Sequence, residues 1–405
     1  MRIRQRSLMK SLKILFLYFL FIILFSLKNV YAHTEPNDNN DIEELLIKSL
    51  YEIADGNLNN ALLTIDTIIE KKPNFKLAHL IKGDIYQAYA EGINAFGGPD
   101  NQSKEKLNDL KEEARQRIKS HSKAGFSSVN STIRTTLPDE LKKIIYIDTS
   151  NSRLFIFEKD GVMLNKVFDV YASIGKNGSR KNHEGDKKTP IGVYSLEKKI
   201  KQPLSDFYGE GAYPINYPNS FDKLLNKTGH GIWIHGTPKN TYSRPPQSSD
   251  GCVVITNEDF INFEKQINNN DVKVIISDEA YEDYFKATHE SDHSDFISAF
   301  NSWKTNWEAK NFDSYLTFYD SNAQYNFKSF KYWTDAKLKV FENSYGINVL
   351  VENFIAIDYP DDKDNLKFVE FKQTYTSNIS NNVSIKQQIW RKFNDEWKII
   401  SEATR

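Results

Sequence analysis

Cys252 is the only cysteine among the 405 residues of the chain, and its neighbours indicate a reactive thiol. It ends the run SDGC at 249–252, directly before three apolar residues that predict a strand. His235 ends a second strand-like run upstream. A thiol attacks an acyl carbon as the thiolate, and an imidazole within hydrogen-bond reach can take its proton. The two residues therefore predict nucleophilic chemistry on an acyl group.

The run GIWIH at 231–235 sets the direction of His235. Side chains alternate between the faces of an extended strand, so Trp233 and His235 share one face and the two isoleucines share the other. We expect the isoleucines in the core and His235 in the site. Gly236 follows, and its backbone carbonyl can approach the ring and fix the tautomer, which is the orienting role of a third catalytic member.

Gly251, directly before the thiol, permits a tight turn. We expect its amide and the Cys252 amide to face a developing oxyanion. One structural alternative is that the cysteine is a small buried hydrophobe, as free cysteines often are. Another alternative is a zinc site of His230, His235 and Cys252. A spacing of five along a strand points the two histidines to opposite faces, so we interpret His230 as structural.

The pattern IHGT, a loop, then S-x-G-C-V resembles the signature of the YkuD family of L,D-transpeptidases. Members of this family act on peptidoglycan stem peptides. The resemblance implies that Cys252 is the nucleophile, His235 the base and Gly236 the backbone-carbonyl partner. The segment G-D-x-x-T-P-x-G at 185–192 also resembles this domain, in which it helps to shape the cleft. The resemblance covers residues 143–277.

Two positions depart from the family pattern S-H-G-C-I-R. Asp250 stands at the second histidine and Val254 at the arginine. These departures affect substrate handling more than thiol chemistry, because the nucleophile and the mapped base remain. Asp250 is a candidate to hold a cationic group of a diamino acid; capping of a turn is the alternative, since Asp before Gly favours turns.

Further candidates for substrate contact lie around this motif. Ser249 precedes the thiol by three positions, and Trp233 shares the strand face of the base. Arg244, in the loop between the two motif halves, can receive a substrate carboxylate bidentately, although a solvated arginine is the commoner case. The aromatic insertion at 202–227 is expected to border the cleft, with surface packing of its tyrosines as the alternative. Its candidate contacts are Tyr213, Tyr217 and Asn219.

The first thirteen residues carry five basic and no acidic side chains, and the apolar run 14–27 follows them. This pattern predicts a secretory signal that is short for a membrane span of about 20 residues. We expect cleavage after Ala32 and a mature chain in the periplasm or cell envelope, with an uncleaved membrane anchor as the alternative. In an oxidising compartment an unpaired cysteine indicates a reactive thiol or an intermolecular bridge.

The charge of the chain argues against a nucleic-acid partner. The net charge of −1 becomes −7 when the six basic residues of the predicted signal are removed. No cluster of metal ligands and no phosphate-binding loop stands in the sequence, so no cofactor is implied. The expected partner is the peptidoglycan stem peptide, with a possible protein partner at either end of the chain.

Residues 41–122 have apolar side chains at spacings of three and four, which predicts helices broken at Gly56 and Pro73. The middle pair resembles one tetratricopeptide-type hairpin. A single hairpin is too few for a solenoid, so a helical cap beside the catalytic domain is favoured over a module for docking partners.

Short alternating runs from Lys143 onward predict antiparallel strands, and the run DVKVIIS at 271–277 predicts the last strand of this domain. Beyond 294, two helical patterns precede long strands and a W-x-I-x-x-E ending. This order resembles the nuclear transport factor 2-like (SnoaL-like) cone fold. We expect the cone to form a pocket for the peptidoglycan strand or a partner, or to serve in dimerisation or packing.

The predicted architecture is a multidomain α+β protein with a helical N-terminal region, a mixed, mainly antiparallel β catalytic domain and a C-terminal α+β cone. The predicted parts are the signal peptide 1–32, helical region and linker 33–138, catalytic domain 139–278, linker 279–294 and cone 295–405. The predicted function is an L,D-transpeptidase acting on tetrapeptide stems through a thioester. The alternatives are an L,D-carboxypeptidase and, in another class, a non-catalytic cell-wall-binding scaffold.

Overall fold

A computed structural model describes residues 42–91, 104–124, 132–134, 137, 140–267, 272–287, 290–325, 328–360 and 365–404. The predicted signal and its cleavage site lie outside these residues. Residue contacts divide the chain into two units, one formed by residues 1–127 with 240–246 and the other by 128–239 with 247–405. Within the described ranges, no helix combines the length and the apolar character that a bilayer crossing requires.

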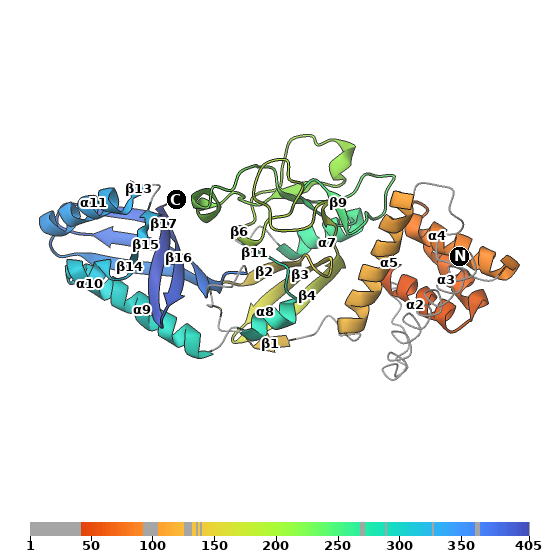
Figure 1. Cartoon of the computed structure of the whole chain (residues 1–405), viewed down its shortest axis with the longest axis horizontal. Helices are drawn as coiled ribbons and strands as arrows, with labels where there is room; N and C mark the ends of the chain where they lie inside the picture. Colours follow the sequence, from red (N-terminus) through yellow and green to blue (C-terminus); the bar gives the residue numbers. More distant parts are fainter. Residues whose placement is uncertain are drawn as a thin grey trace, which may run out of the picture. The chain divides into compact units, whose positions relative to one another are not determined.

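The first unit is built of helices that pack around one apolar core (Figure 1). The helices are α2 (Ile42–Ala54), α3 (Leu58–Lys71), α4 (Lys76–Glu91) and α5 (Lys104–Ala124). Apolar residues at helical spacing face inward, and small side chains allow close packing of α3 against α4. Ala61 and Ala78 are fully buried at this contact. The helical character predicted from the periodicity is confirmed.

A six-stranded sheet lies at the centre of the second unit. Its strands are β1 (Thr132–Arg134), β2 (Lys143–Asp148), β3 (Arg153–Asp160), β4 (Met163–Tyr171), β6 (Gly192–Ser195) and β11 (Lys273–Ser277). Their order is β1-β4-β3-β2-β11-β6. The hairpins β2-β3 and β3-β4 are antiparallel as predicted, while β11 returns parallel to β2. All six residues of β2 are buried, because both faces of the sheet are covered.

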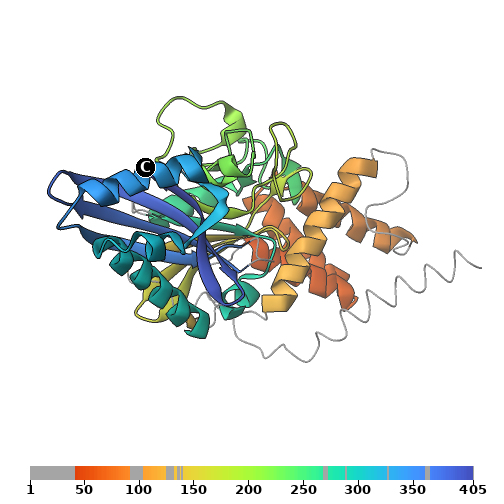
Figure 2. The ribbon, with the colours of Figure 1, turned by 60° about the vertical axis from the view of Figure 1, so that its left-hand side comes forward.

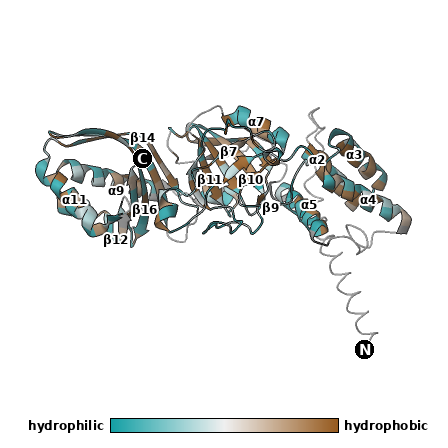
Figure 3. Cartoon of the chain, turned by 90° about the horizontal axis from the view of Figure 1, so that it is seen from above, coloured by the Kyte–Doolittle hydropathy of each residue, from teal (hydrophilic) through white to brown (hydrophobic). Residues whose placement is uncertain are grey.

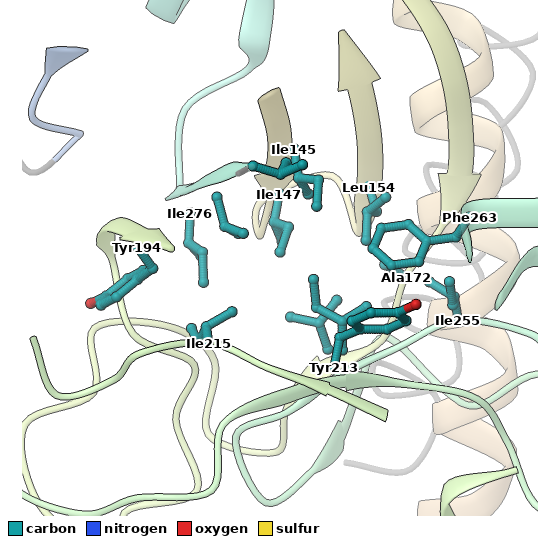
Figure 4. Close-up of a cluster of buried hydrophobic side chains, with 14 of the residues drawn as sticks. Ile145, Ile147, Leu154, Ala172, Tyr194, Tyr213, Ile215, Ile255, Phe263 and Ile276 are labelled. Carbon is teal, nitrogen blue, oxygen red and sulfur yellow. The ribbon is translucent and has the colours of Figure 1, made fainter. Parts of the chain in front are cut away.

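A smaller sheet covers one face of the central sheet and carries the catalytic motif. Its strands are β7 (Ala212–Pro214), β8 (Trp233–His235) and β10 (Val253–Val254), in the order β10-β8-β7. Together with α7 (Asn257–Ile267), these strands enclose an apolar core that includes Ile145, Ile215 and Phe263 (Figure 4). Figure 3 shows apolar residues concentrated on β7, β10 and β11. The motif strands are therefore held by a packed core.

The C-terminal part is a second sheet lined by helices on one side (Figure 2). Its helices are α9 (Glu290–Glu308), α10 (Phe312–Leu316) and α11 (Phe330–Asn343). Its strands are β12 (Tyr319–Tyr325), β13 (Lys328–Ser329), β14 (Asn348–Asp358), β15 (Leu366–Thr376), β16 (Asn381–Phe393) and β17 (Glu396–Thr404). The order β13-β12-β17-β16-β15-β14 brings β12 parallel to β17. The predicted helices and long strands are confirmed, but β12 and β13 were missed.

The predicted linker 279–294 differs from the structure. It contains α8 (Tyr281–Ala287) and the start of α9. Tyr281, Tyr284 and Phe285 are buried in a core that also receives residues of the C-terminal sheet. The many charged side chains of this segment led to the prediction of a linker instead of an amphipathic helix. The aromatic residues of this helix cover the second face of the central sheet.

Candidate active site

Strands β8 and β10 run side by side and hold the two residues of the predicted catalytic pair. They pair in parallel, with Val253 opposite Ile234 and Val254 opposite His235. Cys252 lies directly before β10, two positions before Val254, so strand alternation predicts that it faces the side of His235. The apolar partners Ile232 and Ile234 are buried in the core, as the alternation predicts.

His235 is anchored by a backbone carbonyl. Its Nδ1 lies 2.7 Å from the carbonyl oxygen of Gly236. Because this oxygen only accepts hydrogen bonds, Nδ1 carries the proton and the lone pair of the neutral ring is on Nε2. This tautomer suits a general base. The hydrogen bond expected between His235 and Gly236 is therefore present.

Aromatic residues cover His235, which is fully buried rather than open to solvent. They come from the short 3-10 helix η1 (Asp206–Tyr208). The ring of Tyr208 stands edge-on at 5.1 Å from the imidazole, and that of Phe207 lies at 5.9 Å, between centroids. Tyr208 also contacts Trp233 at 4.9 Å. Burial excludes water from the base and strengthens local electrostatic interactions.

The thiol of Cys252 is half-buried and lies beside a carbonyl group. Its Sγ donates a hydrogen bond to the Gly231 carbonyl oxygen at 3.4 Å. This contact fits the neutral thiol, because a thiolate would repel the carbonyl oxygen.

The turn before the thiol is fixed by Gly251 and Ser249. Gly251 has φ +125°, and a side chain there would meet the Lys188 carbonyl oxygen at 2.8 Å. The Ser249 hydroxyl accepts from the Gly251 amide at 3.1 Å and donates to the Cys252 carbonyl at 2.6 Å. The Gly251 amide is thus engaged within the turn, and an oxyanion contact through the Cys252 amide stays a prediction.

Thr189, from the G-D-x-x-T-P-x-G segment, ties a neighbouring strand to this turn. Its fully buried hydroxyl accepts from the Gly175 amide at 2.9 Å and donates to the Gly251 carbonyl at 3.0 Å. Gly175 ends β5 (Ile174–Gly175), which pairs with β9 (Gln247–Ser249). The segment therefore positions the residues around the thiol.

Comparison with known families accounts for this arrangement. Residues 142–276 match the L,D-transpeptidase catalytic domain of the YkuD family, and residues 295–403 match the Cds6 C-terminal NTF2-like domain. The chain carries a YkuD catalytic domain followed by an NTF2-like domain. The resemblance stated from the sequence is confirmed. Residues 142–276 are thus a domain of the L,D-transpeptidase family, which relates the protein to peptidoglycan.

Solved structures with the same YkuD-type organisation include two bacterial proteins. The helical cell shape determining protein Pgp2 from Campylobacter jejuni is 23% identical with a TM-score of 0.58, and the match covers 68% of this chain and 97% of Pgp2. Bd1075 from Bdellovibrio bacteriovorus is 28% identical with a TM-score of 0.54, over 68% of this chain and 97% of Bd1075. The likeness to Pgp2 shows the fold alone. No curated protein sequence matches the chain.

Asp250 lies on the surface of the YkuD domain beside the thiol. Its side chain is 82% exposed and lies 3.6 Å from the ammonium group of Lys187. The carboxylate is therefore accessible to a cationic group, but it already has a cationic neighbour. Val254, at the family's arginine position, is buried in the core and carries no charge to the surface.

Two predicted substrate contacts are turned inward in the YkuD domain. Tyr217 is 6% exposed and its hydroxyl donates to the Thr228 carbonyl at 3.1 Å, so its side chain packs inside the domain. Ser249 is 2% exposed and engaged within the turn, which makes it a positioning residue. Of the other insertion residues, Tyr213 is buried in the core and Asn219 caps α6 (Ser220–Leu224).

Trp233 and Arg244 have different surroundings. Trp233 is half-buried beside Tyr208, on the face that carries His235. Arg244 lies in the segment 240–246, which packs with the helical unit. In that unit Ser243 donates to the Glu113 carboxylate at 2.6 Å. A substrate contact through Trp233 or Arg244 stays a prediction.

A metal centre is not built from the histidines of the YkuD domain. His230 is 84% exposed and lies 3.6 Å from Glu184. Among the described residues, no group of three or more His, Cys, Asp or Glu side chains could hold a metal ion.

Sequence reasoning missed the aromatic cover of His235 and the role of Asn257. Phe207 and Tyr208 stand within the aromatic insertion, but their distance from the motif in sequence gave no sign of the contact. Asn257 follows β10 at the start of α7, where asparagine usually signals only a helix cap. Its contacts are with the loop after His235 rather than with its own helix.

Proposed function

We propose that this protein is a peptidoglycan-modifying cysteine L,D-transpeptidase that acts on tetrapeptide stems. The observation that carries the proposal is the arrangement around β8 and β10. The pairing of Val254, two positions after Cys252, with His235 supports a thiol near the imidazole, and the Gly236 carbonyl at 2.7 Å from Nδ1 supports Nε2 as the basic nitrogen. A thiol beside a base oriented in this way suits acyl transfer.

In the proposed first step, the thiol turns from Gly231 toward the imidazole and its proton passes to Nε2 of His235. The thiolate attacks the carbonyl carbon of the L-centre of the tetrapeptide, at its bond to the terminal D-residue. The resulting oxyanion accepts a hydrogen bond from the Cys252 amide. The carbon–nitrogen bond then breaks as His235 returns the proton to the leaving amine. The product is a thioester on Cys252.

The acceptor determines the outcome of the second step. An amine of another stem, deprotonated by His235, attacks the thioester and gives a cross-link, with the thiol restored. Water in the same place releases a tripeptide, which is the carboxypeptidase alternative. Asp250 beside the thiol supports recognition of a cationic amine, since its carboxylate is 82% exposed.

We further propose that the protein works in the cell envelope, where peptidoglycan lies, and that it contributes to cell shape. The basic and apolar start of the chain supports export. The description of Pgp2 as a helical cell shape determining protein supports a role in shape. The NTF2-like domain is proposed to position the peptidoglycan strand or a partner.

The proposal is tested by incubating the purified protein with sacculi, digesting them and separating the products. New cross-linked dimers indicate transfer, and tripeptides alone indicate trimming. Cys252→Ala is expected to abolish either product. Unchanged sacculi with the wild-type protein, together with retained binding to them, would favour the non-catalytic scaffold.

A further inference from the structure

Asn257 holds the peptide group that orients the catalytic base. Its Oδ1 accepts from the Thr237 amide at 3.1 Å, and its Nδ2 donates to the Thr237 carbonyl at 2.8 Å. The Thr237 amide belongs to the same planar peptide group as the Gly236 carbonyl. That carbonyl accepts the hydrogen bond from His235 Nδ1 at 2.7 Å. One rigid plane therefore links Asn257 to the imidazole.

The geometry of a trans peptide makes this link directional. Its N–H and C=O groups point in opposite directions in one plane, so a partner that fixes the N–H also fixes where the oxygen points. The peptide donates its N–H to Asn257 and accepts from His235 at its oxygen, and these two hydrogen bonds polarise it in the same sense. The polarisation strengthens the Gly236 oxygen as an acceptor. A stronger acceptor at Nδ1 stabilises the imidazolium form that follows proton transfer.

Two glycines leave the space that Asn257 occupies. A side-chain carbon at Gly236 would lie 2.3 Å from Asn257 Oδ1, and one at Gly209 would lie 2.0 Å from the same oxygen. Asn257 Oδ1 also accepts from the Glu210 amide at 3.1 Å, just after the helix that places Tyr208 on the imidazole. One carboxamide thus connects the peptide that accepts from the ring with the segment that carries the aromatic cover of the ring.

We infer that Asn257 is a positioning residue for His235, acting through the Gly236–Thr237 peptide and the segment at Glu210. The inference rests on the proposed function, because it assigns Asn257 to the same base. Its effect is on the proton affinity and direction of the imidazole, and it makes no contact with substrate.

The test measures the rate of Cys252 alkylation by iodoacetamide against pH in the full-length protein. In wild type, a thiolate–imidazolium pair makes labelling fast below the ordinary thiol pKa of about 8.5. In Asn257→Ala the labelling curve is expected to move up by about one pH unit, so the rate at neutral pH falls about tenfold. In Asn257→Asp the acceptor oxygen for the Thr237 amide is kept, so the expected curve lies close to that of wild type.

Asp259→Ala is the matched control, because it weakens the start of the same helix without touching the peptide at Gly236. Asp259 accepts from the Thr256 hydroxyl at 2.7 Å, and its amide donates back at 3.1 Å. This variant is expected to lose stability while its labelling curve stays that of wild type. The titratable side chains on the segments beside His235 are unchanged in all variants: Asp206, Tyr208, Glu210 and Cys252.

The outcomes separate the inference from the proposed function. A wild-type curve with a depressed midpoint and unchanged curves in both Asn257 variants overturn the inference and leave the proposed function standing. A wild-type midpoint at the ordinary thiol value contradicts the proposed function itself. If Asn257→Ala does not fold, the near-isosteric Asn257→Leu, which also lacks the acceptor oxygen, takes its place: a wild-type curve overturns the inference and an upward shift supports it.

Discussion

The backbone geometry of the turn before Cys252 restricts which residues can stand there. Gly251 has φ +125° and faces the Lys188 carbonyl, so no other side chain fits there without moving the turn. The Thr189 hydroxyl donates to the Gly251 carbonyl, and the Ser249 hydroxyl accepts from the Gly251 amide. Cys252 is therefore held in place by hydrogen bonds of its neighbours to the turn.

Gly251→Ala is expected to lower the free energy of unfolding by about 1–3 kcal/mol and to slow labelling of Cys252, because both φ and the contact with Lys188 are unfavourable. Thermal unfolding and iodoacetamide labelling measure the two effects. Gly161→Ala is the control, since Gly161 has φ +56° but open space around it. It should lose stability and keep the labelling rate; equal labelling in both variants would contradict this account of the turn.

At the scale of elements, the segment 181–189 is organised by one carboxylate. Asp186 accepts from Lys181 Nζ at 2.7 Å and from the amides of Asn182 and Lys188 at 2.8 and 3.1 Å. Burial raises the pKa of Asp186, but these hydrogen bonds outweigh burial and lower the pKa to about 2. The ionised carboxylate therefore stabilises the loop that ends at Thr189.

Asp186→Asn is expected to cost about 2 kcal/mol of unfolding free energy at pH 7. A folded-state pKa below the unfolded value gives stability that is present above about pH 4 and is lost as pH falls toward 2. The difference between wild type and the variant should therefore shrink across this window. Denaturant unfolding at several pH values measures it, and a difference independent of pH would contradict the role of the charge.

The sequence predicted the structure correctly where the alternation of apolar residues and a motif indicated the same strand. Alternation in GIWIH correctly predicted which side chains of β8 enter the core, and the SDGC run located the thiol at a strand start. It failed where contacts join distant segments. The aromatic composition of the insertion suggested that Tyr217 borders the cleft, whereas its side chain is buried. The contact of η1 with His235 could be seen only in the folded chain. The helix α8 was hidden because its charged face dominates its composition.

At the scale of the whole molecule, the YkuD and NTF2-like domains share a buried ion pair. Lys273 on β11 lies 2.6 Å from Glu370 on β15, and their side chains are 1% and 9% exposed. Glu370 also accepts from Gln387 at 2.7 Å. One apolar core also contains residues from both sheets. The two domains are therefore expected to unfold together.

Lys273→Met is expected to destabilise this unit by about 3–5 kcal/mol, because it leaves the Glu370 carboxylate buried without its cation. The double variant Lys273→Met, Glu370→Gln should recover part of this loss, since no uncompensated charge remains. A double-mutant cycle by urea unfolding measures the coupling. Purely additive effects would contradict a direct interaction between the two charges.

The central claim is that Cys252 is a nucleophile activated by His235. Its most direct test is the intact mass of the protein after incubation with a carbapenem, whose strained ring acylates reactive catalytic thiols. Wild type is expected to gain one carbapenem mass on Cys252, His235→Ala to gain it far more slowly, and Cys252→Ala to gain none. An unchanged wild-type mass with an intact thiol would contradict the claim.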